Sequence, residues 1–421
     1  MYKTTKLDNG LTVVTKSMAQ RASVSVGVWV GVGSRFEPAR LNGVCHFIEH
    51  MLFKGTRRRS PLQITQAVEG IGGYLNAFTS EDHTCYYSKA RHDRFPELLN
   101  VLMDMLLNST FPLGEIRKER SVIKEEILMY LDQPHQHVQE VLNEVLWPDH
   151  PLGRNIVGTD ASLDGMSRRH LVEFVQNNYH AGNTVIAAAG NLKHDAIVAE
   201  VARHAKRFPK AARPLSMPPV EVNQTEPWVK LVTKDTEQTQ IAMGIRACSR
   251  HDERRHALRV LNAILGENMS SRLFQVIRED HGLVYNIYSS VSLFEDVGSL
   301  TVSAGLDTDA LPKALKLIVQ EFKRLREKPP GAAELRHARE YLLGQIDLNL
   351  EGTESQMMAL GEQQLGYGCV ASPAGVKKKI AAITAAQVRR VAREFLKPEN
   401  ICLALVSPLK SDQGLQDLLR F

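Results

Sequence analysis

Hydrophobic positions in the first part of the chain alternate with polar or small ones, which is the pattern of β-strands. Every second residue from Val24 to Val32 is a valine, and this predicts a strand buried on at least one face. Residues 4–15, with a turn at 8–10, and residues 74–89, rich in aromatic residues and threonine, predict two hairpins. The spacing of apolar residues then becomes helical. It predicts helices over 61–69, 95–108, 112–131, 137–146, a region ending near 178, and 196–207, with a strand over 184–189.

The second half repeats this order of elements. Residues 208–228 contain repeated prolines and little periodicity, so they predict a linker. We expect an α+β protein of two homologous α/β-sandwich domains, 1–207 and 229–421, each a mixed or antiparallel sheet with helices packed on it. The later strands are expected over 241–245, 284–293, 300–304 and 401–406, and the later helices over 254–265, 273–279, 310–328, 332–349, 353–366 and 386–396.

The composition is that of a soluble globular protein with more than one domain. The chain has 421 residues, of which 43% are hydrophobic and 24% charged. A net charge of +5 is small for this length, and the basic run at 57–59 is short, so we expect a solvated loop there and no nucleic-acid partner. No stretch is apolar enough for a membrane helix and no signal region is visible, so we expect no membrane insertion and a cytoplasmic location. The five cysteines lack metal or redox spacing and are expected to be free, mostly buried thiols.

One segment, 43–52, carries the spacing of a metal-binding helix. As a helix it presents an apolar stripe on one side and, on the other, two histidines four residues apart with a glutamate between them. The order is H-x-x-E-H, formed by His46, Glu49 and His50, the inverse of the zinc motif H-E-x-x-H. The alternative is two histidines that face solvent without a metal. The stripe consists of Val44, Phe47, Ile48 and Met51.

The predicted helix 112–131 offers a third ligand. Glu119 and Glu126 are seven residues apart and fall on one face among apolar residues, where an unpaired carboxylate would cost several kcal/mol. A metal ion and a hydrogen bond that orients a ligand would remove this cost. Two alternatives stay open at this point: the helix is exposed on a wider arc, or Glu125, about 100° round the helix, is the ligand instead.

These motifs together resemble the pitrilysin family of zinc peptidases, the inverzincins, and within it the half-length branch that contains the mitochondrial processing peptidase β subunit and its bacterial homologues. The separation of His50 and Glu126 is 76 residues (126 − 50), as in that family. The resemblance covers nearly the whole chain. Its further motifs are Glu119-Arg120-x-Val122-Ile123-x-x-Glu126, Leu75–Thr79, His150–Arg154, Gly158-Thr159, Ser271–Phe274 and Gly282–Tyr285.

The resemblance implies one zinc ion per subunit, held by His46, His50 and Glu126. Glu49 would be the general base that takes a proton from water and passes it to the leaving amine. Glu119 would orient a ligand histidine, although an ordinary structural carboxylate remains the alternative.

The resemblance also implies substrate contacts. Arg278 and Tyr285 would donate hydrogen bonds to the oxyanion that forms during hydrolysis. Asn76 and Ala77 would bind the peptide through their backbone, as an added strand. Phe53 could line a pocket beyond the scissile bond, although an apolar residue at this position can equally belong to the core.

Single-chain members of the family carry four such domains, so a two-domain chain is expected to find its other half in a second subunit. We expect a homodimer that encloses a chamber for unfolded peptide substrates. Two alternatives remain: a precursor-processing peptidase that works with a different partner subunit, and a non-catalytic relative such as the core subunits of respiratory complexes. The intact H-x-x-E-H motif argues against the second.

Overall fold

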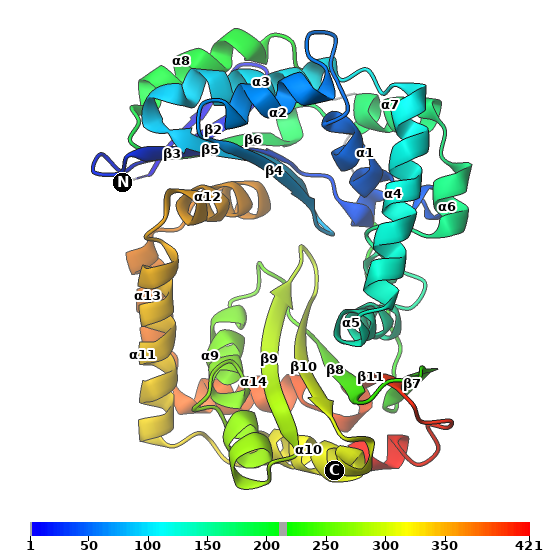
Figure 1. The fold of residues 1–421 in the computed structure, drawn as a ribbon. Helices are drawn as coiled ribbons and strands as arrows, with labels where there is room; N and C mark the ends of the chain where they lie inside the picture. Colours follow the sequence, from blue (N-terminus) through cyan, green and yellow to red (C-terminus); the bar gives the residue numbers. More distant parts are fainter. Residues whose placement is uncertain (1, 210–216) are drawn as a thin grey trace. The chain divides into compact units, whose positions relative to one another are not determined.

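The computed structural model describes residues 2–209 and 217–421, which form two compact units (Figure 1). Neither unit is one continuous stretch of chain. Unit 1 is built from Met1–Ile127, Arg154–Met217 and Asp347–Ser372. Unit 2 is built from Leu128–Gly153, Pro218–Ile346 and Pro373–Phe421.

Unit 1 contains a six-stranded sheet in the order β1-β2-β6-β3-β5-β4. All neighbouring pairs are antiparallel except β2 and β6, which run parallel. The strands are β1 (Tyr2–Lys6), β2 (Thr12–Ser17), β3 (Ser23–Val30), β4 (Tyr74–Thr79), β5 (Thr84–Arg91) and β6 (Thr184–Gly190). The helices are α1 (Val44–Leu52), α2 (Pro61–Glu69), α3 (Phe95–Asn108), α6 (Asp160–Gly165), α7 (Arg168–Asn178), α8 (His194–Ala205) and α12 (Thr353–Tyr367), together with most of α4 (Leu113–Leu131).

Helices cover both faces of this sheet. α2, α3 and α8 lie against one face, and α12 lies against the other (Figure 1). Every residue of β3 after Ser23 is therefore buried, whereas its alternating sequence required only one buried face. The contact with α12 is close at Gly361, where an added Cβ would lie 2.1 Å from Trp29 Nε1. Trp29, Met357 and Leu360 belong to one buried cluster between α12 and the sheet.

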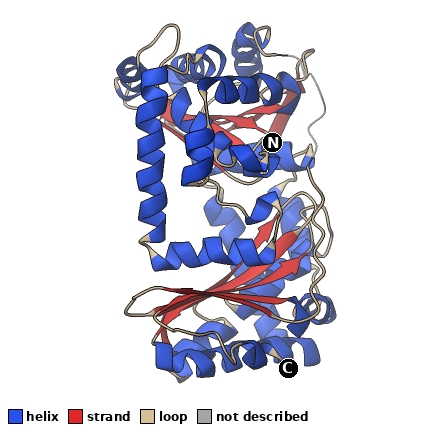
Figure 2. Cartoon of the chain, turned by 90° about the vertical axis from the view of Figure 1, so that its right-hand side faces the viewer, coloured by secondary structure: helices blue, strands red, loops and turns tan. Residues whose placement is uncertain are grey.

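Unit 2 repeats this plan with a five-stranded sheet in the order β7-β11-β8-β10-β9, in which only β7 and β11 are parallel. Figure 2 shows helices on both faces of each sheet. The strands are β7 (Trp228–Thr233), β8 (Thr239–Ala247), β9 (Val284–Leu293), β10 (Gly298–Leu306) and β11 (Ile401–Ser407). The helices are α5 (Pro134–Leu146), α9 (Arg255–Leu265), the π-helical segment η6 (Phe274–Asp280), α10 (Leu311–Glu327), α13 (Pro373–Ala381) and α14 (Ala385–Phe395), with most of α11 (Ala332–Asn349).

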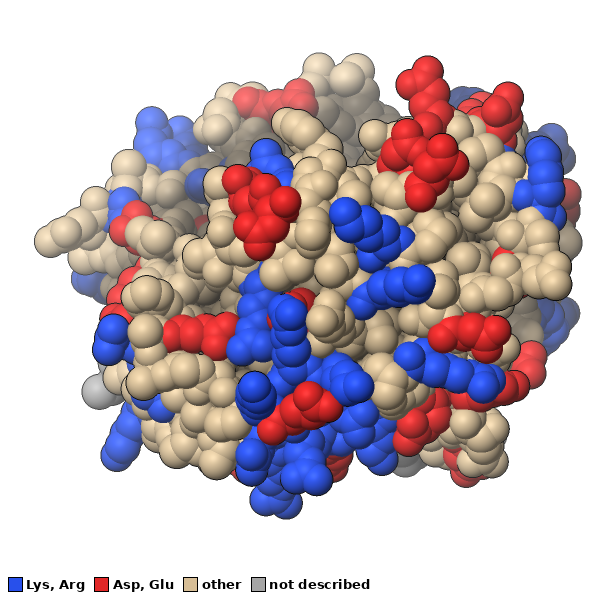
Figure 3. All heavy atoms as spheres, turned by 90° about the horizontal axis from the view of Figure 1, so that it is seen from below, with Lys and Arg blue, Asp and Glu red and all other residues tan. Residues whose placement is uncertain are grey.

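The core of unit 2 lies on both sides of its sheet. α9, α10 and α14 pack on one face and α5 on the other. Figure 3 views the molecule from below, the side on which α10 and α14 lie in Figure 1. Lysine and arginine side chains gather on one part of this surface, with acidic side chains scattered among them. α14 carries Arg389, Arg390 and Arg393, which line one hollow of unit 2.

The prediction of an α+β fold with mixed sheets covered by helices is confirmed. The contiguous division into 1–207 and 229–421, however, does not describe the exchange of helices between the two halves of the chain. α5 comes from the first half and covers the second sheet, and α12 comes from the second half and covers the first. Of the expected linker 208–228, residues 210–216 lie outside the described residues, and 217–227 contain no helix or strand.

Two elements were missing from the sequence-based expectation. β7 and α13 are short, and neither has a strong hydrophobic pattern of its own; α13 has one fully buried residue, Ile380. All five cysteines are free, and Cys369 is the exposed one. Among the residues that the structure describes, no helix combines the length and apolar character needed to cross a membrane.

Candidate metal centre

α1 carries two of the three residues of the candidate site, and its apolar side fixes its position. The predicted stripe is confirmed, since Val44, Phe47, Ile48 and Met51 are each 0% exposed. The polar side is less exposed than its sequence alone indicates, because His46 is itself buried at 8% exposure. The His46 imidazole is therefore sheltered from bulk solvent, whereas the His50 side chain is 21% exposed.

A buried carboxylate caps the beginning of α1. The oxygens of Glu37 accept hydrogen bonds from the backbone N–H groups of Gly43 (2.7 Å) and Cys45 (2.8 Å) and from the Asn42 amide (3.1 Å). Burial raises the pKa of Glu37 to about 7, and these hydrogen bonds oppose the rise. Gly43 has φ +91°, and a Cβ there would lie 2.6 Å from the Val157 carbonyl oxygen, so only glycine fits this start.

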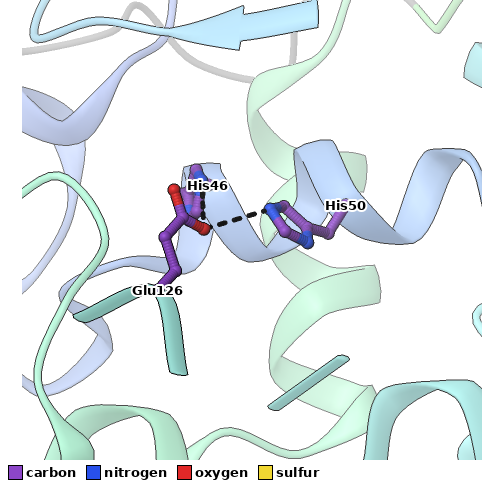
Figure 4. Close-up of side chains that lie close together, drawn as sticks. All are labelled: His46, His50 and Glu126. Carbon is purple, nitrogen blue, oxygen red and sulfur yellow. Dashed lines mark ion pairs between the residues drawn. The ribbon is translucent and has the colours of Figure 1, made fainter. Parts of the chain in front are cut away.

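Three donor atoms converge in front of α1. Oε2 of Glu126, from α4, lies 3.7 Å from Nε2 of His46 and 3.7 Å from Nε2 of His50 (Figure 4). One ligand atom from each residue can be chosen so that all three lie within 4.8 Å of one another. The structure thus brings together the three residues that the sequence analysis selected as ligands. Glu125, the rival, is exposed and is not part of this group.

The donor set fits a zinc ion. The two distances of 3.7 Å between Oε2 of Glu126 and the imidazole nitrogens are longer than a hydrogen bond. Zinc ligands lie about 2.0–2.2 Å from the ion, which separates tetrahedral neighbours by about 3.4 Å. Burial lowers the pKa of His46 to about 3, with a smaller effect from the charge of His50, so this imidazole is neutral at physiological pH. Two imidazoles and a carboxylate suit zinc.

A second carboxylate orients His50. Oε2 of Glu119 lies 3.0 Å from Nδ1 of His50, so an N–H at Nδ1 donates to it and Nε2 keeps its lone pair toward Glu126. The other oxygen, Oε1, lies 2.8 Å from Nζ of Lys54. Glu119 is 5% exposed, and these two partners offset the cost of its burial.

Glu49 lies between the two histidines on α1 and has its own partner. The hydroxyl of Thr79, on β4, donates to Oε2 of Glu49 at 2.5 Å. Burial raises the pKa of Glu49 above its ordinary value, while the Thr79 hydrogen bond acts in the opposite direction. A raised pKa makes a carboxylate a better proton acceptor, as a general base beside a metal-ligand cluster requires.

The buried face of α4 is narrower than the sequence pattern suggested. Val122 and Met129 are among the apolar residues expected beside the two carboxylates, yet each is 48% exposed. The buried residues of α4 are Ile116, Glu119 and Ile123. The helix therefore buries little of its surface, and the side chain of Glu126 lies at the margin of the buried face with 22% exposure.

The residues expected to bind substrate in unit 1 lie near α1. Asn76 and Ala77 are on β4, an end strand of the sheet, and β4 packs against α1. The backbone N–H of Ala77 donates to Oδ1 of Asn76 at 2.8 Å. Phe53 is the C-terminal cap of α1 and is partly exposed.

The expected oxyanion donors lie in unit 2. The guanidinium carbon of Arg278, in η6, is 5.7 Å from the ring centre of Tyr285 and 4.6 Å from that of Phe274. Tyr285, on the end strand β9, is 84% exposed. The two donors are thus neighbours on the surface of their own unit.

Sequence reasoning missed Glu37, Lys54 and Thr79. Thr79 lies inside the motif Leu75–Thr79 that carried the resemblance, so the motif itself was the available signal. Lys54 follows α1 directly, but no spacing rule pairs it with Glu119, 65 residues further on (119 − 54). Glu37 precedes a glycine-started helix without a standard capping pattern.

A set of two histidines and a glutamate supported by an H-x-x-E-H helix is typical of zinc peptidases. The sequence matches the family described as Insulinase (Peptidase family M16) over residues 12–160 and the Peptidase M16 inactive domain over residues 165–342. The chain belongs to peptidase family M16. It is 38% identical to an uncharacterized zinc protease of Mycobacterium tuberculosis, over 99% of this chain and 95% of that protein. It is 35% identical to an uncharacterized zinc protease of Bacillus subtilis, over 97% of this chain and 98% of that protein.

Solved structures show the same fold. A protease from Helicobacter pylori superposes with a TM-score of 0.91 at 21% identity, over 97% of this chain and 99% of that one. A peptidase M16 inactive domain from Pseudomonas fluorescens superposes with a TM-score of 0.90 at 19% identity, with the same coverage. At these identities the likeness is one of fold.

Proposed function

We propose that this chain is a zinc-dependent endopeptidase that hydrolyses unfolded peptides. The observation that carries the proposal is the convergence of His46, His50 and Glu126, with Glu49 presented from the same helix as the two histidines. The similarity to proteins named zinc proteases supports the choice of metal and of reaction class.

In this proposal the two Nε2 atoms and the Glu126 carboxylate hold the ion, and Glu119 keeps His50 in the ligating tautomer. Zinc supplies a Lewis acid that acidifies water and polarises a peptide carbonyl. Glu49 takes a proton from the attacking water and passes it to the amine nitrogen as the C–N bond breaks. The Thr79 hydroxyl holds Glu49 in the orientation that this transfer needs.

The peptide binds as an additional strand on β4. The outer side of an end strand offers backbone groups without a neighbouring strand, and such pairing depends little on side-chain identity. The Ala77 N–H is occupied by the Asn76 side chain in the free protein, so the substrate carbonyl displaces that amide oxygen. Phe53, at the end of α1, contributes to the binding of residues beyond the scissile bond.

Arg278 and Tyr285 provide the donors for the oxyanion, and we propose that they serve the metal centre of a second copy of the chain. Two copies would then enclose a chamber that admits unfolded peptides. The cytoplasmic location expected from the sequence stays a prediction.

Replacing Glu49 tests the reaction. Glu49→Gln keeps the size of the side chain and removes the proton acceptor, so kcat for a fluorogenic peptide is expected to fall by about 10²–10⁴-fold with zinc content unchanged. Glu69→Gln, at an exposed position in α2, is the matched control and should retain wild-type kcat. Wild-type turnover in Glu49→Gln would exclude Glu49 as the base.

The oligomeric state distinguishes the proposed homodimer from a peptidase that needs a different partner. Light scattering of the purified chain should give twice the mass of 47.1 kDa, and the same sample should be active. An inactive monomer that gains activity on addition of cell extract would favour the heteromeric alternative.

A further inference from the structure

A cavity in unit 1, whose described lining includes none of the three ligand residues, has no role in the proposed peptidase reaction. It has a volume of about 370 Å³ and lies among the C-terminal end of α3, helix α7, the loop after α1 and residues 207–209. A volume of this size is in the range of small-molecule sites. The loop after α1 contains the basic run 57–59, which was expected to be a solvated loop.

Among the described residues that line this cavity, three are arginines and none is acidic. They are Arg57, Arg168 and Arg207, and none makes an ion pair within the described part of the chain. Arg59, in the same basic run, does make an ion pair, with the buried carboxylate of Asp104 at 2.7 Å. Residues 210–216, outside the described range, contain no aspartate or glutamate either. Three uncompensated guanidinium groups around one cavity favour an anionic ligand.

Two of these arginines are held in place by neutral partners. Arg168 donates from Nε to the Phe111 carbonyl at 3.0 Å and from Nη2 to the Thr110 carbonyl at 3.0 Å. Arg207 donates from Nη2 to the side-chain oxygen of Asn108. These bonds fix the guanidinium groups without neutralising them, so their charge remains available to a ligand.

The rest of the lining is largely apolar. Phe111 and Phe208 are 5% and 6% exposed. Val172 and Val175 belong to α7, and Tyr179 follows its last residue. Phe111 has φ +48°, an unusual backbone conformation for a phenylalanine, and its carbonyl is one of those that hold Arg168. Such strain persists only where the surroundings enforce it and is concentrated at binding sites.

We propose that this cavity binds a small amphipathic anion, in which a carboxylate or phosphate group contacts the arginines and an aliphatic or aromatic body lies against Phe111 and Val172. Carboxylates and organic phosphates share this chemistry. Either headgroup can accept charge-assisted hydrogen bonds from Arg57, Arg168 and Arg207.

Calorimetric titration of the full chain with octanoate and octyl phosphate tests the site. At least one of these anions is expected to bind saturably with one site per chain, and the tighter of the two identifies the headgroup. Octanamide, which has the same body and no charge, is expected to bind at least about tenfold more weakly. Arg57→Gln is expected to weaken binding of the anion by about tenfold or more. The substitution removes a charged donor whose side chain has no other partner in the described structure.

Two further variants make the result specific. Arg58→Gln removes an equal charge from the adjacent exposed residue, which does not line the cavity, and should change affinity by less than about twofold. Val172→Trp fills the cavity without changing charge and should abolish binding of both anions while the thermal midpoint and zinc content are retained. Equal binding of octanamide and octanoate, equal effects of Arg57→Gln and Arg58→Gln, or no saturable binding of either anion would overturn the proposal.

Discussion

One step of helix geometry separates the two candidates for the third metal ligand. Glu125 and Glu126 are adjacent in α4, but their side chains leave the helix about 100° apart. Glu126 reaches the two imidazoles and Glu125 is exposed. Two chemically identical side chains thus differ only in direction, which makes them a matched pair for experiment.

We expect Glu126→Gln to lower zinc affinity by more than the 10–100-fold that loss of a ligand-orienting partner typically costs. The amide is a weaker ligand and leaves the two imidazoles without a counter-charge. Zinc content after dialysis against a chelator of known affinity measures the effect. Glu125→Gln should retain the wild-type affinity, and equal zinc loss in both variants would argue against Glu126 as the ligand.

Glu37 gives the folded protein a pH dependence that does not involve the metal. Its pKa is raised to about 7 in the folded chain, so the folded state holds this proton more tightly than the unfolded state, whose carboxyl has the ordinary value of 4.5. The contribution of this carboxyl to the free energy of unfolding therefore has its greatest value below pH 4.5 and is lost as the pH rises through 7. Glu37→Gln does not titrate and lacks this loss.

Urea unfolding of the zinc-free protein between pH 5 and 8 tests this. The stability of wild type relative to Glu37→Gln should decrease with rising pH, by up to about 3 kcal/mol over the full span. The comparison cancels other titrating groups, including the histidines of the metal site. A stability difference that stays constant or grows with pH would show that the hydrogen bonds from Gly43 and Cys45 outweigh the effect of burial.

Among the helices, α12 shows how a single small residue sets the distance between a helix and a sheet. At Gly361 an added Cβ would lie 2.1 Å from Trp29 Nε1, within a cluster where Trp29 is 2% exposed. The helix can approach the sheet only because this position has no side chain. Since α12 covers the face opposite α2, α3 and α8, this approach also completes the burial of β3.

Gly361→Ala should destabilise the protein by about 1–3 kcal/mol, since either Trp29 or α12 has to shift. The matched control is Gly344→Ala in α11, an exposed helical glycine with nothing within 4 Å of an added Cβ. That change should be neutral or stabilise by up to about 1 kcal/mol, because alanine is the better helix former. Thermal and urea unfolding measure both, and equal effects at the two positions would contradict the close contact.

For the whole chain, the exchange of α5 and α12 means that neither half of the sequence carries all of its own unit. The first sheet is completed by residues 353–367, and the second by residues 134–146. Each half alone would leave one face of its sheet uncovered, with residues such as Trp29 or Cys402 newly exposed to water. The fold is therefore expected to be cooperative across the full length.

Fragments 1–209 and 217–421, expressed separately, should not unfold cooperatively and should bind a dye for exposed apolar surface. Co-expressed, they should form a soluble complex that binds zinc, because α5 and α12 are then both supplied. Size-exclusion chromatography, dye fluorescence and zinc content report the outcome. A cooperatively folded fragment 1–209 with wild-type zinc affinity would show that α12 is dispensable to unit 1.

Much of this protein was accessible from local patterns. The period of apolar residues predicted α1, α3, α4 and the β4–β5 hairpin, and one periodic stripe fixed which side of α1 faces the core. The helical position of Glu126 left Glu125 open as a rival, and the choice between them came from the resemblance, through the separation of 76 residues from His50.

Other features depend on which distant surfaces meet when the chain folds. The Glu37 cap, the Lys54–Glu119 pair and the Thr79–Glu49 hydrogen bond join residues for which no periodicity specifies a partner. The same holds for the exchange of α5 and α12 and for the three arginines around one cavity. Periodicity records which side of an element is buried, because that depends on neighbours within a few residues. It does not record what covers that side, because the covering element is selected by shape and charge across the folded chain.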